Sequence, residues 1–266
     1  MFVNLLFMLG FMLLFFVIVV GIIWLTVSED NYSKDVMPTP GNFIFNGKEY
    51  HNPLPLAQGS STPYMIKSNL VERIRILYQK THDVLKRQDI PFYVSGGTLL
   101  GVHRNKCLPM PFDDDIDIHV DYEHKYELFS DAFTEICAEE GLKTLFLKFN
   151  TVNCADKLGA GVRICLKENQ SQPVLDIFFV KAVGTEIRKI DGWNGDQVTY
   201  SYRERWDVKD VYPLHEKQID DLSICLPNNP ERMLVQQYGE NVMKEISARP
   251  KLFSHSFPFL FRGIWL

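Results

Sequence analysis

The sequence predicts a mixed α/β (α+β) domain, with a mixed sheet flanked by helices and preceded by one N-terminal transmembrane helix. Helical stripes of apolar residues alternate with short strand-like segments from residue 64 onward. Residues 1–28 contain no charged side chain. The chain has 266 residues, of which 46% are hydrophobic and 23% are charged, so its composition is that of one globular domain with an additional segment.

The N-terminal segment, residues 1–28, is expected to be an uncleaved membrane anchor. Its apolar run over residues 5–27 is interrupted only by Gly10, Gly21 and Thr26. A helix of that length covers a hydrocarbon core of about 30 Å, whereas a signal peptide has a shorter apolar core after a basic region. Because the first basic residue is Lys34, charge does not fix the orientation.

Residues 29–63 are rich in Pro, Gly, Ser and Asn and show neither helical nor strand periodicity, so we expect a short stem. The body is expected over residues 64–250. The tail, residues 251–266, is aromatic and too short to span a membrane, and it is expected to dock on the domain or on the membrane interface.

The body is expected to begin with an amphipathic helix over residues 64–88, because apolar side chains recur at helical spacing from Leu70 to Leu85. A strand over 91–95, a Gly96-Gly97 turn and a helical segment over 98–104 follow. Residues 115–120 alternate as a strand. The remaining expected elements are a helix over 122–140 ended by Gly141, strands over 142–149, 162–166, 174–180 and 222–226, and a helix from Asn229 to Tyr238 stopped at Gly239.

Charge and cysteine content exclude some classes of function. With 28 Lys+Arg against 33 Asp+Glu, the net charge is -5, and nucleic-acid binding is not expected because it needs clustered basic charge. The cysteines are widely spaced and lack metal-ligand spacing, so we expect core packing or one lumenal disulfide. They are Cys107, Cys137, Cys154, Cys165 and Cys225.

The segment from Asp113 to Asp117 places four carboxylates in five positions. A solvated acidic turn is the simplest interpretation. However, Asp115 and Asp117 share one face of the expected strand, and Ile116 points into the core, so two hard oxygen ligands lie side by side. Mg²⁺ prefers one or two carboxylates together with waters and substrate phosphates. The pair therefore predicts a metal site for a phosphate-bearing substrate.

A third acid, Asp176, is the only charge in the apolar segment 174–180 and needs a partner. That partner is either a buried salt bridge or a metal shared with Asp115 and Asp117, if the two strands are neighbours. The turn at Gly96, Gly97 and Thr98 offers backbone N–H groups to a phosphate.

Several other polar and aromatic side chains leave alternatives open. Arg104 is either a phosphate contact or a surface charge. His103 and His119 are expected to be structural rather than catalytic. Lys157, Arg163, Arg203 and Arg205 are either surface charges or groups that balance a pyrophosphate. The aromatic side chains of Tyr200, Tyr202 and Trp206 remain unassigned.

Together these motifs resemble the LicD/fukutin nucleotidyltransferase-like proteins. The resemblance rests on the segments 96–101 and 112–118 with Arg104 between them, on Leu175-Asp176-Ile177-Phe178, and on a closing motif over 226–239. It covers roughly residues 65–245. Phe112 departs from the family's usual Trp, residues 29–63 are too short for the extra domain of fukutin, and the clustered cysteines of the fukutin-related protein's zinc site are lacking.

The resemblance implies a nucleotidyltransferase fold and transfer of a phospho-alcohol, such as ribitol phosphate or phosphocholine, from a CDP-alcohol donor to a glycan or glycoprotein acceptor. It further implies Mg²⁺ (or Mn²⁺) and a type II protein of the Golgi membrane, or of the ER, with a lumenal catalytic domain. Asp115 and Asp117 would hold the metal with Asp176 as the third acid, and either Asp115 or Asp176 would act as base. Donor phosphates would contact Gly96, Gly97, Thr98 and Arg104.

Two alternatives remain open at the level of sequence. One is a glycosyltransferase that uses an Asp-x-Asp pair to hold a nucleotide sugar, although the glycine turn and the third acid argue against it. The other is a catalytically silent protein that binds and positions a partner glycosyltransferase.

Overall fold

The computed structural model of the chain describes residue 15 and residues 32–147, 161–194 and 197–246. The expected anchor over residues 1–28 lies outside these residues except for Phe15, and the expected tail over 251–266 lies outside them entirely. Among the described residues, none of the helices combines the length and the apolar character that a membrane crossing requires.

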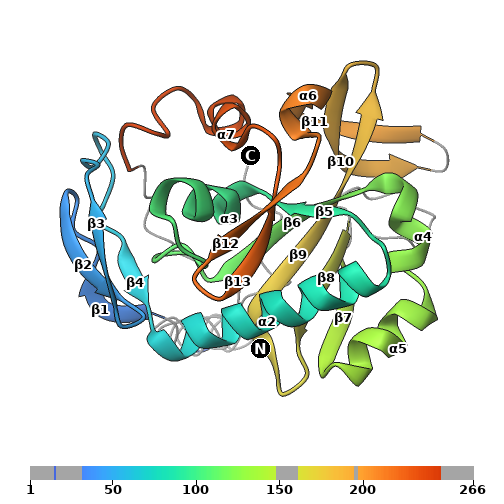
Figure 1. Cartoon of the computed structure of the whole chain (residues 1–266), viewed down its shortest axis with the longest axis horizontal. Helices are drawn as coiled ribbons and strands as arrows, with labels where there is room; N and C mark the ends of the chain where they lie inside the picture. The colour runs from blue at the N-terminus through green and yellow to red at the C-terminus, as the bar shows by residue number, and fades with distance from the viewer. Residues whose placement is uncertain (1–14, 16–31, 148–160, 195–196, 247–266) are drawn as a thin grey trace, which may run out of the picture.

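A seven-stranded mixed sheet forms the centre of the described body (Figure 1). Its main path runs β11-β10-β9-β6-β5, and β8 pairs with both β9 and β7. Neighbouring strands are antiparallel except β6 and β9, which are parallel. The strands are β5 (Phe92–Val94), β6 (Asp115–Asp121), β7 (Leu142–Leu147), β8 (Gly161–Leu166), β9 (Asn169–Val183), β10 (Glu186–Asn194) and β11 (Gln197–Asp207).

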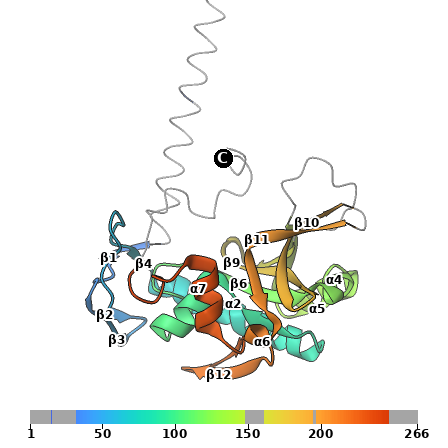
Figure 2. The same cartoon turned by 90° about the horizontal axis from the view of Figure 1, so that it is seen from above.

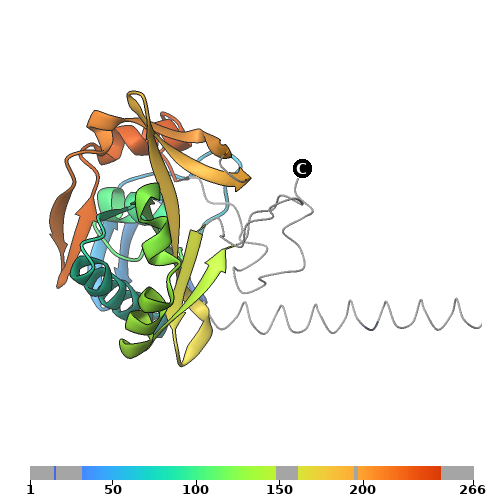
Figure 3. The ribbon, with the colours of Figure 1, turned by 90° about the vertical axis from the view of Figure 1, so that its right-hand side faces the viewer.

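Helix α2 (Ser68–Arg87) lies across one face of the sheet and contacts β8 and β9 (Figures 1 and 3). The buried stripe of α2 includes Leu70, Ile74 and Leu77, which are 0–3% exposed, as the helical spacing predicts. The short helix α5 (Asp131–Glu139) packs beside α2 and β7. The hairpin of β12 (His215–Ile219) and β13 (Leu222–Leu226) contacts β5.

A second group of helices packs near β6 and β11. Helix α3 (Gly96–Leu100) continues into the π-helix η1 (Gly101–Asn105). Helix α7 (Pro230–Tyr238) contacts α3, and it also contacts β11 (Figure 2). Asn229 precedes the helix and caps it, because its side chain accepts a hydrogen bond from Arg232 N at 3.3 Å. Helix α6 (Val208–Val211) contacts α7.

Most of the expected elements are confirmed, with two corrections. Residues 64–66 form strand β4 (Tyr64–Ile66) instead of the first turn of α2. The helix expected over 122–140 is divided into η2 (Tyr122–His124), α4 (Lys125–Leu128) and α5. The division lies at Ser130, because its hydroxyl caps α5 by accepting from Phe133 N at 3.1 Å and so ends the preceding turn.

The expectation that residues 29–63 lack strands is wrong. Strand β1 (Tyr32–Val36) pairs with β4, and β2 (Gly41–Phe45) forms a hairpin with β3 (Lys48–Asn52). The turn consists of Asn46 and Gly47, both with positive φ, which is the Asn-Gly signal of a tight hairpin. Because Phe43 and Phe45 are buried in the main core, this segment is part of the folded body from Tyr32 onward.

Candidate active site

The acidic segment and the third acid meet on the only parallel strand pair of the described sheet. Asp117 of β6 lies in register with Asp176 of β9. The intervening residues Ile116 and Ile118 are fully buried, so alternation turns the carboxylates to the other face. The two acidic strands are therefore neighbours, which is the condition that a metal shared by Asp115, Asp117 and Asp176 requires.

Asp176 has a protein cation as its partner. Arg163 lies opposite Asp176 in the β8–β9 register, and its Nε and Nη2 atoms donate to the two carboxylate oxygens, each at 2.7 Å. Arg163 is 9% exposed and Asp176 is 5% exposed. The hydrogen bonds to Asp176 raise the pKa of Arg163. Of the two partners left open by the sequence, a buried salt bridge is the one observed.

Asp117 is in the opposite electrostatic situation. Desolvation raises its pKa to about 8, and the negative charges of Asp176 and Asp113 contribute to the rise. Lys189 of β10 opposes this shift, so its ammonium lies within electrostatic reach of Asp117. The site therefore has an excess of negative charge that the protein compensates only in part.

Among the described residues, Asp113, Asp114 and Asp115 form a group of three carboxylates whose candidate ligand oxygens all lie within 4.8 Å of one another. Asp114 and Asp115 are buried. This set overlaps the expected set of Asp115, Asp117 and Asp176 at one residue. Oxygen donors of this kind fit Mg²⁺ or Mn²⁺.

The glycine turn is fixed directly against these acids. Ser95 N donates to Asp117 O at 2.9 Å, and Asp117 N donates to Thr98 Oγ1 at 2.9 Å. A Cβ atom on Gly96 would lie 2.8 Å from Asp117 Oδ2, and one on Gly97 would lie 2.3 Å from Asp113 Oδ2. Side chains at these positions would displace the carboxylates, so glycine is required by close approach as well as by the positive φ of Gly96.

A cavity of about 590 Å³ lies beside the turn, between α3, η1 and the end of α7. Gly97, Arg104 and Tyr238 line it. Arg104 Nη1 donates to Val242 O at 3.1 Å, and burial lowers the Arg104 pKa. Arg104 is thus placed at a cavity wall, while the expected phosphate contact Thr98 uses its hydroxyl to hold the backbone of Asp117.

Two residues near the acids have no counterpart among the expected site residues. Desolvation raises the pKa of the Tyr238 phenol, and the charges of Asp117 and Asp113 raise it further, so Tyr238 connects the cavity with the acids. Lys189 Nζ pairs with Glu204 Oε2 at 2.7 Å and lies 4.2 Å from the ring centre of Phe178. Sequence gave little signal for Lys189, because a single lysine in a strand resembles a surface charge.

His119 is structural, as expected. It is 1% exposed, lies edge-on to Tyr93, and packs at 5.4 Å from the ring of Trp206. Burial lowers its pKa well below the ordinary value, so the ring is neutral. Trp206, which donates from Nε1 to Met233 O, is therefore a core residue and not a stacking platform.

The remaining candidates lie away from the acids or outside the described residues. Arg205 lines a separate cavity of about 240 Å³ with Glu186 and Arg232. Lys157 and Cys154 lie outside the described residues. The other cysteines are buried and carry free thiols: Cys107, Cys137, Cys165 and Cys225. Of the two expected roles, core packing or a disulfide, core packing is the one observed for these four.

Comparison with known proteins gives relatives whose own roles are uncharacterized. The chain is 25% identical over 182 residues to the uncharacterized protein RP689 of Rickettsia prowazekii (strain Madrid E), covering 66% of this chain and 58% of that protein. It is 26% identical over 200 residues to the uncharacterized protein RT0683 of Rickettsia typhi (strain ATCC VR-144 / Wilmington), covering 74% and 54%. The chain therefore spans little more than half the length of these curated relatives.

Solved structures give distant likenesses. The solution structure of the antibiotic-resistance factor ANT(2″)-Ia is 14% identical, with a TM-score of 0.35 over 59% of this chain and 65% of that one. The lincomycin-bound crystal structure of the lincosamide antibiotic adenylyltransferase LnuA is 15% identical, with a TM-score of 0.34 over 57% and 78%.

The family assignment rests on a longer match. The family described as "LicD/FKTN/FKRP, nucleotidyltransferase domain" matches residues 89–229, which is more than half of the chain. The matched residues include the glycine turn, the acidic strand β6 and Asp176 on β9. The chain belongs to the LicD/FKTN/FKRP family and carries its nucleotidyltransferase domain.

Proposed function

We propose that this protein is a membrane-anchored, Mg²⁺- or Mn²⁺-dependent phosphotransferase. It transfers a phospho-alcohol of the ribitol phosphate or phosphocholine type from a CDP-alcohol to a hydroxyl of a glycan or glycoprotein. Residues 1–28 anchor it, and the body lies in the lumen of the Golgi or the ER. Family membership supports the transferase class, and the acidic site supports the phosphate-bearing substrate.

The observation that carries this proposal is the group of carboxylates at the start of β6, which lies against a glycine turn that itself lines a cavity. Asp176 is neutralised by Arg163, whereas the pKa of Asp117 is raised by desolvation and by neighbouring carboxylates. A site of this kind is stabilised by a cation that arrives with the substrate. Asp115 and Asp117, the pair that the sequence predicts, would hold that cation, and Asp113 and Asp114 lie next to Asp115. When bound, it would neutralise charge on the donor phosphates.

The chain's own residues would position the reacting groups. Gly96 and Gly97 let the backbone of the turn lie directly against the carboxylates of Asp117 and Asp113, because a Cβ atom at either position would clash with them. Arg104 on the cavity wall would contact the donor phosphates, and Lys189 on β10 lies within electrostatic reach of Asp117.

In the transfer, the acceptor hydroxyl oxygen forms a bond to the phosphorus that carries the alcohol. The bond from that phosphorus to the bridging oxygen of the donor breaks, and CMP leaves with the electron pair. Asp115 takes the hydroxyl proton. This role is given to Asp115 and not to Asp176 because both oxygens of Asp176 accept hydrogen bonds from Arg163.

The test is a donor screen on the purified full-length chain in detergent. The protein is incubated with Mg²⁺ and each of several CDP-alcohols, CDP-choline and nucleotide sugars, and melting temperature and CMP release are measured. We expect metal-dependent CMP release with one CDP-alcohol, reduced at least 1000-fold by Asp117→Asn. Asp89→Asn, at an exposed loop position with positive φ that asparagine also tolerates, is the matched control.

The Arg163–Asp176 ion pair favours a second candidate, a catalytically silent protein that positions a partner glycosyltransferase. An acid neutralised by the protein itself serves the fold even without catalysis. Well-folded protein that neither gains thermal stability nor releases CMP across the whole donor panel would contradict the phosphotransferase proposal and support this one. Transfer of a sugar without phosphate would contradict both.

A further inference from the structure

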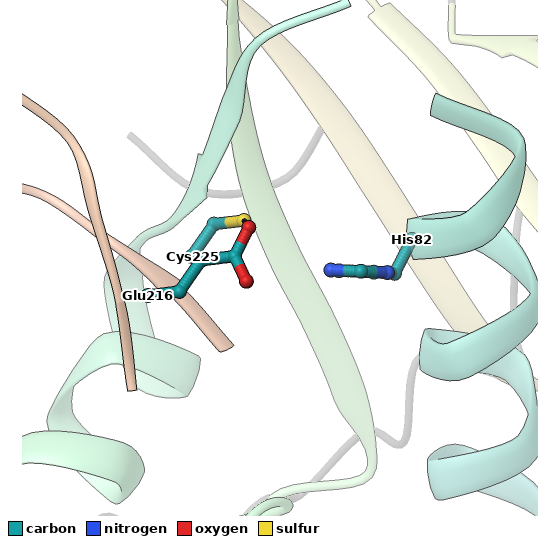
Figure 4. Close-up of side chains that lie close together, drawn as sticks. All are labelled: His82, Glu216 and Cys225. Atoms are coloured by element: carbon teal, nitrogen blue, oxygen red, sulfur yellow. Dashed lines mark hydrogen bonds between the residues drawn. The ribbon is translucent and has the colours of Figure 1, made fainter. Parts of the chain in front are cut away.

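A second polar cluster lies between α2 and the β12–β13 hairpin (Figure 4). It consists of His82 from α2, Glu216 from β12 and Cys225 from β13, and their candidate ligand atoms all lie within 4.8 Å of one another. Glu216 and Cys225 are directly paired in the hairpin register, so their side chains share one face. None of the three residues takes part in the acidic site.

His82 is already oriented as a metal ligand would be. It is 9% exposed, and its Nδ1 lies 3.1 Å from Asp83 Oδ1. With the proton on Nδ1 donated to that carboxylate, Nε2 presents a lone pair. Nε2 is buried and has no hydrogen-bond partner among the described residues. The ring points toward Glu216 and Cys225 (Figure 4). In metal sites, the ring nitrogen that does not bind the metal usually donates to a carboxylate, as Nδ1 would to Asp83 here.

The other two side chains complete a mixed donor set. The thiol of Cys225 donates to Glu216 Oε1 at 3.9 Å, and Ser223 Oγ donates to Glu216 Oε2 at 2.6 Å. Lys86 also pairs with Glu216 Oε1. Because the Lys86 side chain is 49% exposed, it can turn into solvent when a cation takes its place.

We propose that His82 Nε2, a Glu216 carboxylate oxygen and Cys225 Sγ form a binding site for Zn²⁺. Nitrogen, oxygen and sulfur donors in one site suit Zn²⁺ and not Mg²⁺, which selects oxygen. Three protein ligands leave a fourth position for water. An adjoining cavity of about 320 Å³, lined in part by Glu216 and Cys225, has room for that water.

Binding forms the Zn–S bond and releases the thiol proton to solvent, with no change of oxidation state. The ion would connect the C-terminal half of α2 to the hairpin, which contacts β5 directly before the glycine turn. The site therefore acts on the stability of the domain, and its occupancy does not depend on the acidic site or on the proposed transfer reaction.

The test uses Co²⁺ as a spectroscopic substitute for Zn²⁺ on the full-length chain. We expect a thiolate-to-cobalt charge-transfer band that Zn²⁺ abolishes by displacement. Cys225→Ser is expected to remove the band, whereas Cys165→Ser, at another buried free cysteine, is expected to keep it. Asp83→Asn is expected to weaken the metal affinity about 10-fold, because it removes the support of the histidine ring.

A second measurement covers the case in which Cys225→Ser does not fold. Zn²⁺ at a free concentration 100-fold above its dissociation constant is expected to raise the melting temperature by about 5 °C or more, and His82→Gln is expected to abolish that rise. The rise is expected to persist in Asp117→Asn, which separates this site from the acidic one. Absence of any cobalt band in the wild-type chain, or an undiminished band in folded Cys225→Ser, would overturn the proposal.

Discussion

The β6 side and the β9 side of the acidic site carry carboxylates in register with each other, yet these carboxylates have different electrostatic surroundings. On β9, Asp176 is held by both arms of Arg163 in a buried ion pair. On β6, Asp117 lies among other acids, and desolvation raises its pKa. One carboxylate is neutralised inside the protein, and the other is not.

The difference separates a structural role from a binding role within one strand pair. Arg163 keeps β8, β9 and their buried charges together, so the β9 side contributes to folding without a ligand. On the β6 side the carboxylates repel one another when they are ionised, and a bound cation would reduce this repulsion. Charge that is costly to the empty protein is typical of a functional site.

The largest expected effect tests the structural side. Asp176→Asn leaves the guanidinium of Arg163 buried without its counter-charge, so the free energy of unfolding is expected to fall by about 3–5 kcal/mol. Urea unfolding followed by circular dichroism measures it. The double variant Arg163→Met with Asp176→Leu is expected to recover most of the loss. A wild-type urea midpoint for Asp176→Asn would show that the pair is not structural.

A smaller effect is expected on the glycine turn of the β6 side. Gly97→Ala places a methyl group against Asp113 Oδ2, and Gly96→Ala places one against Asp117 Oδ2. Displacement of these acids is expected to lower the rate of CMP release about 10- to 100-fold.

Gly184→Ala is the control for Gly96→Ala, since Gly184 also has a positive φ but no atom near its Cβ position. This control isolates the backbone strain from the contact with the acids. Equal rates of CMP release for Gly96→Ala and Gly184→Ala would show that the contact with Asp117 does not affect the reaction.

The smallest effect is the pH dependence of stability on the β6 side. Because the folded pKa of Asp117 is raised above the unfolded value of about 3.9, its contribution is fully present below pH 4 and is lost as pH rises toward 8. Asp117→Asn, which carries no charge, is therefore expected to gain in melting temperature relative to the wild type as pH rises.

Added Mg²⁺ is expected to remove the pH-dependent difference, because it stabilises the ionised carboxylate. Thermal melts from pH 4 to 8, with and without Mg²⁺, measure both effects. An Asp117→Asn variant that loses stability relative to the wild type as pH rises would contradict the assignment.

Much of the site was predictable because its residues lie in short continuous segments of the sequence. The alternation of Asp115, Ile116 and Asp117 predicts which side chains enter the core, and the strand β9 was recognised by its apolar run around Asp176. The partner of Asp176 was not predictable, because Arg163 comes from β8 and is placed by register alone. Lys189 and Tyr238 were missed for the same reason.

The fold shows a similar division. Helix α2 and strands β5, β6, β8 and β13 follow from local periodicity over a few residues. The N-terminal hairpin was overlooked although Asn46-Gly47 signals it, because the surrounding prolines and glycines suggested a stem. The hairpin is part of the body because Phe43 and Phe45 pack into a core formed by residues far away in the sequence, and local composition does not predict such packing.

The sequence by itself determined the family, the mixed α/β class and the acidic strand, because motif spacing and side-chain alternation are properties of short segments. Only the tertiary structure decided which acid pairs with an arginine and which lies among other acids, since that depends on the register of β8 against β9. It alone also brought His82 to Glu216 and Cys225, whose positions are more than 130 residues apart along the chain. The Arg163–Asp176 pair and the group of His82, Glu216 and Cys225 each join residues of different elements, and tertiary packing alone fixes those neighbours.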